Sequence, residues 1–188
     1  MLQAELELLV LAFQQGDKSA FARLYQHFHR DLIRFAASQL HGQHVAADLV
    51  QNVWLKVMKR VHRLDDPAVF TSWLYRAVRW EVLDWQKQPQ QRRTEALPDA
   101  DVLMAGPLPS VETPLSAAIA TLSSADQLLL QLFYRHQLAQ QQIALILQIP
   151  LGTVKSRLHR IRQLLAQHSS VHNATPGAVV SSHDSGDN

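Results

Sequence analysis

Residues 140–158 read QQQIALILQIPLGTVKSRL, and this stretch has the pattern of two short helices joined by a bend. Pro150 and Gly152 mark the bend, and Thr153 can place a side-chain oxygen near the start of the second helix. Small Ala144 lets the two helices approach closely. Five apolar residues at helical spacing can bury one helix against the other: Ile143, Leu147, Ile149, Val154 and Leu158. The stretch therefore predicts a helix-turn-helix.

The second of these helices divides into a polar side and an apolar side. Ser156, His159 and Arg160 project on one side, with Lys155 and Arg157 beside them. The opposite side is apolar and comprises Leu158, Ile161 and Leu165. A helix that reads DNA in the major groove needs this division. We therefore expect the segment to bind duplex DNA, and the alternative is an αα-hairpin whose charges are only solvated.

The distribution of charge favours the DNA-binding interpretation more than the total does. The net charge is +2, from 18 basic and 16 acidic residues, which by itself does not indicate nucleic acid. Between Asp126 and Asp184, however, there is no carboxylate. The same stretch holds five cations, namely Arg135, Lys155, Arg157, Arg160 and Arg162. Such a concentration of positive charge suits a phosphate backbone.

The rest of the 188 residues also has helical periodicity, and 47% of the chain is apolar, which is enough to build a core. Helices are predicted from about residue 20 to Gly42, with Asp17 or Ser19 as the N-cap, and then at 45–61, 68–86, 115–122, 124–135, 140–147 and 152–167. In the helix at 45–61 the apolar face includes Leu49 and Trp54. The sequence therefore predicts an all-α fold.

Composition divides the chain into two small helical domains. Residues 88–114 contain five prolines and little periodicity, so we expect an extended, flexible tether there. After His168 the residues are small and polar, which predicts a disordered tail. The expected organisation is a first domain at 1–88, a linker at 89–114, a second domain at 115–168 and a tail at 169–188.

Several classes of protein are excluded by what the sequence lacks. Without cysteine the chain cannot form disulfides, thiolate zinc sites or iron–sulfur clusters. It has no glycine-rich phosphate loop and no support for a Ser/His/Asp triad, so we expect no enzymatic activity, no cofactor and no metal. The N-terminus carries acids where a secretory signal needs cations, and no run of about 18 apolar residues occurs. We expect a cytoplasmic protein without membrane insertion.

Three motifs resemble those of one family. Residues 48–54 (DLVQNVW) and 70–79 (FTSWLYRAVR) resemble region 2 of the extracytoplasmic-function (ECF) sigma factors of the sigma-70 family, and residues 150–160 (PLGTVKSRLHR) resemble their region 4. The resemblance implies a region 2 bundle of the three-helix type followed by a region 4 helix-turn-helix. It also implies a transcription initiation factor that binds core RNA polymerase and directs it to specific promoters, by recognising and melting the −10 element and reading the −35 element.

The resemblance also assigns roles to residues of the first domain. The second helix would bind the clamp of the largest polymerase subunit, through Asp48, Leu49, Gln51, Asn52 and Trp54. The loop at 64–69 would capture a flipped base of the −10 element, and the third helix would hold the melted strand. The −10 residues would be Leu64, Asp65, Phe70, Trp73, Arg76, Arg79 and Trp80.

The second domain would read the −35 element, and the resemblance assigns this role to Thr153, Lys155, Ser156, Arg157, His159 and Arg160. Among them Ser156, His159 and Arg160 would contact bases, while Lys155 and Arg157 would position the helix on the DNA backbone. The resemblance further implies that the flap of the second-largest polymerase subunit is a partner. An anti-sigma factor is implied as well.

Three positions depart from the family pattern. Asn52 stands where the family usually has a carboxylate, Trp80 where it has asparagine, and Gln142 where it has glutamate. Two other functions remain open from the residues alone. One is a helix-turn-helix regulator that binds duplex DNA without core polymerase, and the other is an adaptor that binds another helical regulator rather than DNA.

Overall fold

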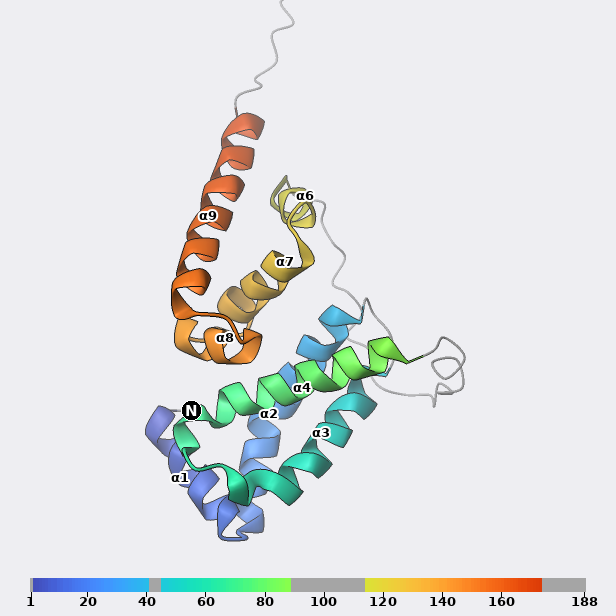
Figure 1. The fold of residues 1–188 in the computed structure, drawn as a ribbon, viewed down its shortest axis with the longest axis vertical. Helices are drawn as coiled ribbons and strands as arrows, with labels where there is room; N and C mark the ends of the chain where they lie inside the picture. Colours follow the sequence, from blue (N-terminus) through green and yellow to red (C-terminus); the bar gives the residue numbers. More distant parts are fainter. Residues whose placement is uncertain (1, 41–44, 89–113, 174–188) are drawn as a thin grey trace, which may run out of the picture.

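The computed structural model describes residues 2–40, 45–88 and 114–173, and within these ranges every regular element is a helix (Figure 1). The prediction of an all-α fold is therefore confirmed. Residues 89–113 of the predicted linker (89–114) and residues 174–188 of the predicted tail (169–188) lie outside the described residues, whereas Pro114 is the first residue of a helix. None of the described helices combines the length and the apolar character needed to cross a membrane.

Four α-helices form the N-terminal bundle: α1 (Gln3–Gln14), α2 (Lys18–Gln39), α3 (Ala46–Arg60) and α4 (Phe70–Lys87). Two short 3₁₀ helices, η1 (Val61–Arg63) and η2 (Pro67–Val69), connect α3 to α4. The expected three-helix bundle is present as α2, α3 and α4, and α1 is a further helix that was not predicted. Helix α1 packs on α2 through buried residues three and four apart, which are Leu6, Leu9, Val10 and Phe13.

Helix α2 begins where the sequence predicts, and Asp17 is its N-cap. The Asp17 carboxylate accepts hydrogen bonds from the backbone N–H groups of Ser19, at 2.7 Å, and Ala20, at 3.3 Å. The Ser19 hydroxyl donates a third bond, and together these bonds lower the pKa of Asp17. Gly16 precedes the cap with φ +91°, a conformation that glycine adopts without steric cost.

The core of the N-terminal bundle is made of large side chains that have no exposed surface. Phe35 and Phe70 are its largest members, and Leu24, Leu32 and Leu74 pack with them. Complete burial of one such side chain stabilises the fold by about 1.5–3 kcal/mol. This core fixes the outward faces of α3 and α4, which carry the candidate contacts described below.

The C-terminal bundle consists of α6 (Pro114–Ala120), α7 (Ser124–Leu130), α8 (Gln140–Leu147) and α9 (Leu151–Asn173). A π-helical segment, η3 (Gln131–Arg135), extends α7. The predicted helix-turn-helix is α8 followed by α9. The expectation of a disordered tail from residue 169 is wrong for residues 169–173, which continue α9.

The bend between α8 and α9 differs from the prediction. Gln148 ends α8 in the left-handed conformation, with φ 56°, and thereby redirects the chain. Pro150 precedes α9 and its carbonyl accepts from the Thr153 N–H at 2.9 Å. Gly152, which the sequence suggested as part of the bend, lies instead in the first turn of α9, and its open surroundings leave room for a side chain. The turn thus depends on Gln148 rather than on a glycine.

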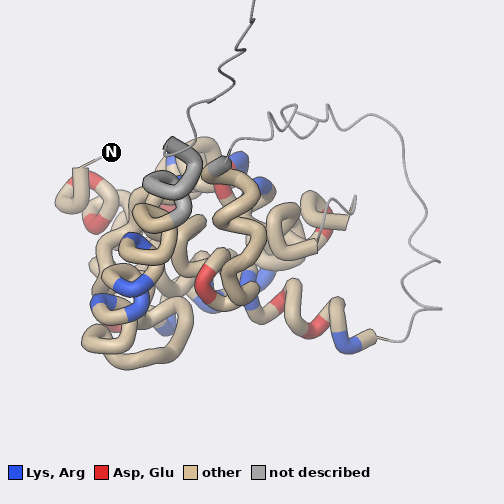
Figure 2. Tube along the Cα trace, turned by 90° about the horizontal axis from the view of Figure 1, so that it is seen from above, with Lys and Arg blue, Asp and Glu red and all other residues tan. Residues whose placement is uncertain are grey.

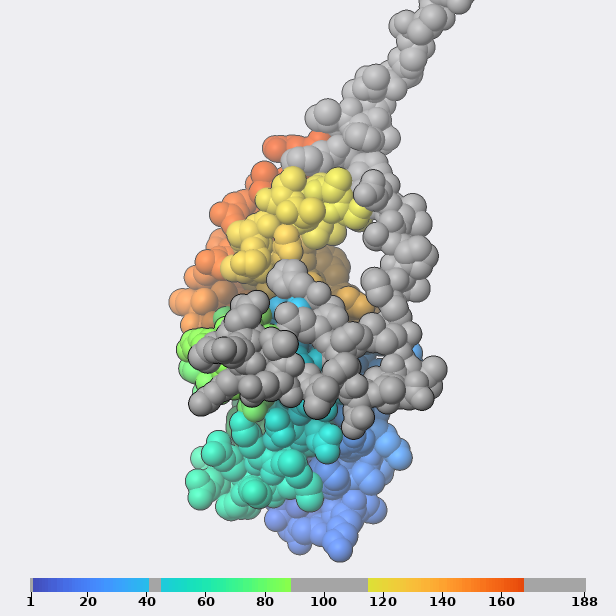
Figure 3. Space-filling model, turned by 90° about the vertical axis from the view of Figure 1, so that its right-hand side faces the viewer, coloured from blue at the N-terminus to red at the C-terminus, as the bar shows by residue number. Residues whose placement is uncertain are grey.

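The two bundles contact each other where α8 packs on α4, and Figure 3 shows the C-terminal bundle (yellow to red) resting on the N-terminal one (blue to green). The Tyr75 hydroxyl and Nδ1 of His136 share a hydrogen bond of 3.1 Å, and the His136 ring meets Phe35 edge to face. A second bond joins the Ser38 hydroxyl to Oε1 of Gln131 at 2.7 Å. Burial raises the pKa of Tyr75, and the nearby Asp31 charge raises it further. We call this contact the junction.

Candidate nucleic-acid interface

Helix α9 presents the polar face that the sequence predicts. Its apolar side is buried against α8 and α7, since Val154, Leu158 and Ile161 have no exposed surface. Four of the six predicted −35 residues are exposed, namely Lys155, Ser156, His159 and Arg160. The other two, Thr153 and Arg157, are half-buried. The first three turns of α9 therefore bring all six residues together, and the distribution of charge along the chain can be followed in Figure 2.

Three side chains on this face have partners within the protein. The Ser156 hydroxyl donates to the carbonyl of Thr153 at 3.1 Å. The His159 ring pairs with the Gln163 amide at 3.0 Å. Arg160 donates from Nη2 to Oδ2 of Asp126 at 2.6 Å, and this carboxylate belongs to α7. The predicted base contacts are thus already oriented by neighbours before any DNA is present.

Sequence reasoning missed the partner of Arg160. Asp126 lies one turn before Leu129 and Leu130, both of which are buried, so helical spacing places it on the inner side of α7. A carboxylate on a buried face needs a cation or a hydrogen-bond donor. That signal is present in the sequence, although it does not say which of the later arginines is the partner.

Gln142 departs from the glutamate of the family pattern, but its side chain still makes a hydrogen bond at the start of α8. Oε1 of Gln142 accepts from the Ala139 N–H at 3.0 Å, which satisfies a backbone donor at the start of α8. An amide oxygen therefore supplies the acceptor that a glutamate would supply, but without its negative charge.

A second candidate site lies where η1 meets α4. A hollow of about 190 Å³, which we call the loop pocket, is lined by Arg60, Arg63, Leu64 and Trp73. Leu64 and Trp73 are predicted −10 residues, whereas the two arginines were not predicted. An indole wall beside two cations suits an unstacked base and its phosphate.

Helix α1 holds the loop that forms this pocket. The Gln14 amide donates to the carbonyl of Val61 at 2.9 Å and to that of Leu64 at 2.7 Å. On the far side of the loop, Asp66 accepts from the Ala68 N–H at 2.9 Å and starts η2. The pocket wall is therefore fixed from both ends.

The remaining predicted −10 residues divide between surface and core. Asp65 and Arg76 are exposed, Trp80 is 51% exposed and Arg79 is half-buried, so all four remain accessible. Phe70 is completely buried, and its ring lies in the core against Phe28 at 5.9 Å between centroids. A direct DNA contact by Phe70 is therefore wrong, because no part of its side chain reaches the surface.

The predicted polymerase-binding residues of α3 divide in the same way. Asp48, Gln51 and Asn52 are exposed, but Leu49 and Trp54 belong to the core. Trp54 packs against Phe21 and Tyr25 of α2, with ring centroids 5.8 and 5.2 Å apart. A direct contact by Leu49 or Trp54 with another protein is wrong, because only 7% of Leu49 and 3% of Trp54 is exposed.

Two exposed apolar residues of α3 were missed. Leu55 and Met58 are each about half exposed and follow Gln51 by four and seven positions, so the three share one outer face of the helix. The signal was available, because the buried stripe of α3 is complete without them. With Asp48 and Asn52 they form a mixed polar and apolar surface, which we call the α3 face.

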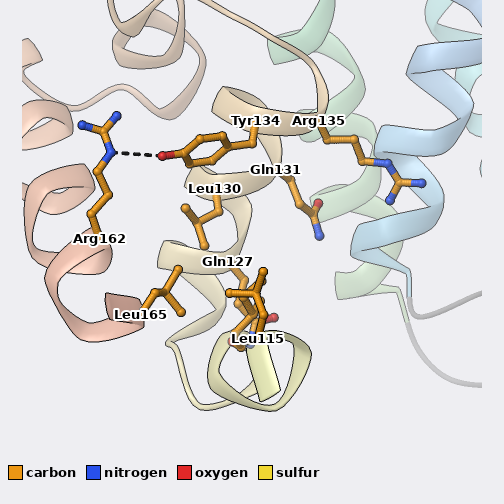
Figure 4. Close-up of a pocket in the computed structure, with 9 residues that line it drawn as sticks. Leu115, Gln127, Leu130, Gln131, Tyr134, Arg135, Arg162 and Leu165 are labelled. Carbon is orange, nitrogen blue, oxygen red and sulfur yellow. Dashed lines mark hydrogen bonds between the residues drawn. The ribbon is translucent and has the colours of Figure 1, made fainter. Parts of the chain in front are cut away.

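A larger pocket of about 400 Å³ opens in the C-terminal bundle, and we call it the C-terminal pocket. Figure 4 shows Leu115, Leu130 and Leu165 gathered on one side, and the Tyr134 hydroxyl accepting from Nε of Arg162 at 3.0 Å above them. The Arg162 guanidinium also lies over the Phe133 ring, 5.4 Å from its centroid. The pocket thus has apolar walls and a cationic rim.

Comparison with protein families matches both parts of the chain. The sigma-70 region 2 family matches residues 24–93, and the sigma-70 region 4 family matches residues 113–165. The first match covers most of α2 and all of α3 and α4 with the loop pocket, and the second covers α6 to most of α9.

Relatives of known function are similar over most of this chain. ECF RNA polymerase sigma factor SigE of Mycolicibacterium smegmatis is 31% identical over 156 residues, which are 76% of this chain and 60% of SigE. The match thus spans less than two thirds of that relative. ECF RNA polymerase sigma factor RpoE of Cereibacter sphaeroides is 28% identical over 160 residues, which are 82% of this chain and 88% of RpoE.

Two solved structures share the fold. CnrH, in complex with the cytosolic domain of CnrY, superposes with a TM-score of 0.62 at 17% identity, over 90% of this chain and 99% of CnrH. The sigma factor RpoE of Bartonella quintana, in complex with the anti-sigma factor NepR, gives a TM-score of 0.59 at 20% identity, over 80% of this chain and 97% of RpoE.

Proposed function

We propose that this chain, which belongs to the ECF group of the sigma-70 family of sigma factors, binds core RNA polymerase and directs it to specific promoters by melting the −10 element and reading the −35 element. Members of this family are transcription initiation factors rather than enzymes. The chain would therefore supply promoter specificity to the polymerase.

The observation that carries this proposal is that one chain presents two surfaces of different form, each suited to nucleic acid. The polar face of α9 has the form of a helix for the major groove of duplex DNA. The loop pocket, with Trp73 between cations and Leu64, has the form of a site for an unstacked base. A regulator that only binds duplex DNA needs the first surface and has no use for the second. This difference favours a sigma factor over the stand-alone regulator.

Melting of the −10 element would be supported by the loop pocket and by α4. Extraction of one base costs a few kcal/mol of stacking, and stacking on an aromatic side chain returns about 1–3 kcal/mol per base. Trp73 offers such a surface in the pocket, and exposed Trp80 offers another. Arg76 and Arg79, three positions apart on α4, would hold the phosphates of the separated strand.

Two surfaces are suited to the polymerase. The α3 face would bind the clamp of the largest subunit, with Leu55 and Met58 as apolar contacts among polar residues. The C-terminal pocket would accept an apolar segment of the flap of the second-largest subunit. An anti-sigma factor is a further proposed partner, supported by the complex of Bartonella RpoE with NepR and by the shared fold.

The test is binding of core polymerase by the purified chain, followed by transcription in vitro. A Gln51→Ala/Met58→Ala variant changes exposed residues of the α3 face and should lose polymerase binding while it stays folded. Leu8→Ala, at an exposed apolar residue of α1, is the matched control and should bind like wild type. If the folded wild-type chain bound duplex DNA but not core polymerase, the stand-alone regulator would replace the sigma factor.

A further inference from the structure

Asp126 is an unusual residue in the C-terminal bundle. It is the one acidic residue in the sequence from 114 to 173, a stretch that contains five Lys or Arg residues. It is also buried, with 5% of its surface exposed. Its Oδ2 accepts from Arg160, while its Oδ1 is buried and has no hydrogen-bond partner among the described residues.

The position of the Asp126 carboxylate is fixed by α7. The Asp126 N–H donates to the carbonyl of Ser123 at 2.9 Å and to its hydroxyl at 3.2 Å, which sets the first turn of the helix. Buried Leu129 and Leu130 anchor the same side of α7 against the core. The carboxylate therefore faces α9 from a rigid position.

The Arg160 guanidinium is bound to Asp126 through one nitrogen, and most of the arginine side chain is exposed. Its side chain is 60% exposed although the carboxylate that binds it is buried. A guanidinium has five N–H donors in one plane. The bond to Asp126 uses one hydrogen of Nη2, so both hydrogens of Nη1 and the second of Nη2 are left for another ligand. Those donors match O6 and N7 of guanine.

Stability alone is a poor explanation of this ion pair. Removal of a carboxylate from water is costly, and a carboxylate with one oxygen unpaired recovers only part of that cost. An apolar residue of similar size would join α7 to α9 at least as well. The ion pair is better explained by a need to orient Arg160 for DNA binding.

We propose that Asp126 is a positioning residue that holds the guanidinium of Arg160 in the orientation in which it reads a guanine of the −35 element. This inference rests on the proposed function, in which Arg160 contacts that element. Asp126 itself touches no DNA. It acts by removing the rotational freedom of the arginine before the DNA arrives, which makes a two-bond contact with guanine more selective.

The experiment uses full-length chain assembled with core polymerase, and promoters with a fixed −10 element and a randomised −35 element. Sequencing of the transcribed templates gives the base preference at every −35 position. Arg160→Ala should lower the preference for guanine at one position by about 5- to 150-fold. Asp126→Leu should relax the same position by at least about 5-fold, with other positions unchanged. Arg30→Ala, an exposed cation of α2 outside both DNA surfaces and the C-terminal pocket, is the control and should leave the −35 preference unchanged.

Thermal unfolding of the same variants separates positioning from folding. Asp126→Leu should unfold at the wild-type temperature or above it, because the unpaired buried oxygen is gone. If Asp126→Leu does not fold, Asp126→Asn is the second variant, because asparagine keeps the shape of the side chain and removes its charge. In the Arg160→Ala background neither change should alter base preference further.

The possible outcomes are distinct. If Arg160→Ala relaxes one position but both Asp126 variants leave it intact, the positioning role is overturned while the proposed function stands. If Arg160→Ala changes no position, Arg160 does not read a base and the inference fails with it. If the wild-type holoenzyme initiates at no promoter, the proposed function itself fails.

Discussion

The hydrogen bond between Tyr75 and His136 at the junction leads to a quantitative prediction. Tyr75→Phe keeps the ring but removes the hydroxyl that pairs with Nδ1 of His136 at 3.1 Å. Nε2 of His136 is buried and already without a partner in the described part of the chain. The variant therefore leaves the imidazole with no hydrogen bond at the junction. An unpaired buried polar group costs about 1–3 kcal/mol.

This cost should appear in the equilibrium between joined and separated bundles, because the lost bond connects one bundle to the other. At 1.4 kcal/mol per factor of ten, the loss lowers the population ratio of joined to separated chains by about 5- to 150-fold. The absence of cysteine makes the measurement direct, since Gln26→Cys and Gln167→Cys place one dye on an exposed site of each bundle.

Single-molecule energy transfer between the two dyes should then show a larger low-efficiency population for Tyr75→Phe than for wild type. Tyr134→Phe removes an exposed tyrosine hydroxyl away from the junction and is the matched control. An unchanged distribution in Tyr75→Phe, with both bundles folded, would refute the reasoning that this bond holds the bundles together.

Three further predictions concern the junction, the loop pocket and α3. Burial lowers the pKa of His136 below its ordinary 6.5; Asp31 raises it and Arg135 and Arg34 lower it. The joined form therefore holds a neutral imidazole, so it is fully favoured above pH 6.5 and weakens as the pH falls below that value. Energy transfer between the two dyes should show this pH dependence for wild type but not for His136→Gln. Gln14→Ala removes two hydrogen bonds to the loop, which costs about 1–3 kcal/mol. The variant should reduce formation of the open complex more than it reduces affinity for polymerase. Permanganate reactivity of the −10 element measures the open complex. Leu49→Ala should lower the free energy of unfolding by about 2–5 kcal/mol in urea titration, whereas exposed Met58→Ala should change it by less than about 0.5 kcal/mol; equal losses would place Leu49 outside the core.

Helical periodicity predicts most of the fold, and its failures have physical causes. The helix-turn-helix and the helices around it follow from apolar spacing, and α8 has the predicted bounds of Gln140–Leu147. Helix α1 was missed because residues 8–13 are apolar almost without interruption, which hides the alternation of faces. The bend was assigned to Pro150 and Gly152, which are common turn residues, whereas Gln148 adopts the left-handed conformation that redirects the chain.

The candidate sites were predicted less completely than the fold. A motif gives the position of a residue in a family pattern but not the direction of its side chain. Leu49 and Trp54 share the apolar stripe that predicts the helix, and that stripe, rather than the motif, decides that they are buried. The pair of Asp126 and Arg160 spans 34 positions and depends on how α7 packs on α9, which local spacing does not encode.

Under the proposed function, the junction would also set an order of events at a promoter. One bundle would engage the −10 element and the other the −35 element of the same promoter. A chain whose two bundles are joined through Tyr75 and His136 holds the loop pocket and the polar face of α9 at one fixed separation. The 25 residues from 89 to 113 span at most about 80–90 Å, so the covalent connection allows the bundles to lie farther apart than the junction does. Under the proposed function, separation of the bundles would precede or accompany engagement of an element that lies beyond the reach of the joined form. Any partner that strengthens the junction would then act as a repressor without covering either proposed DNA-binding surface.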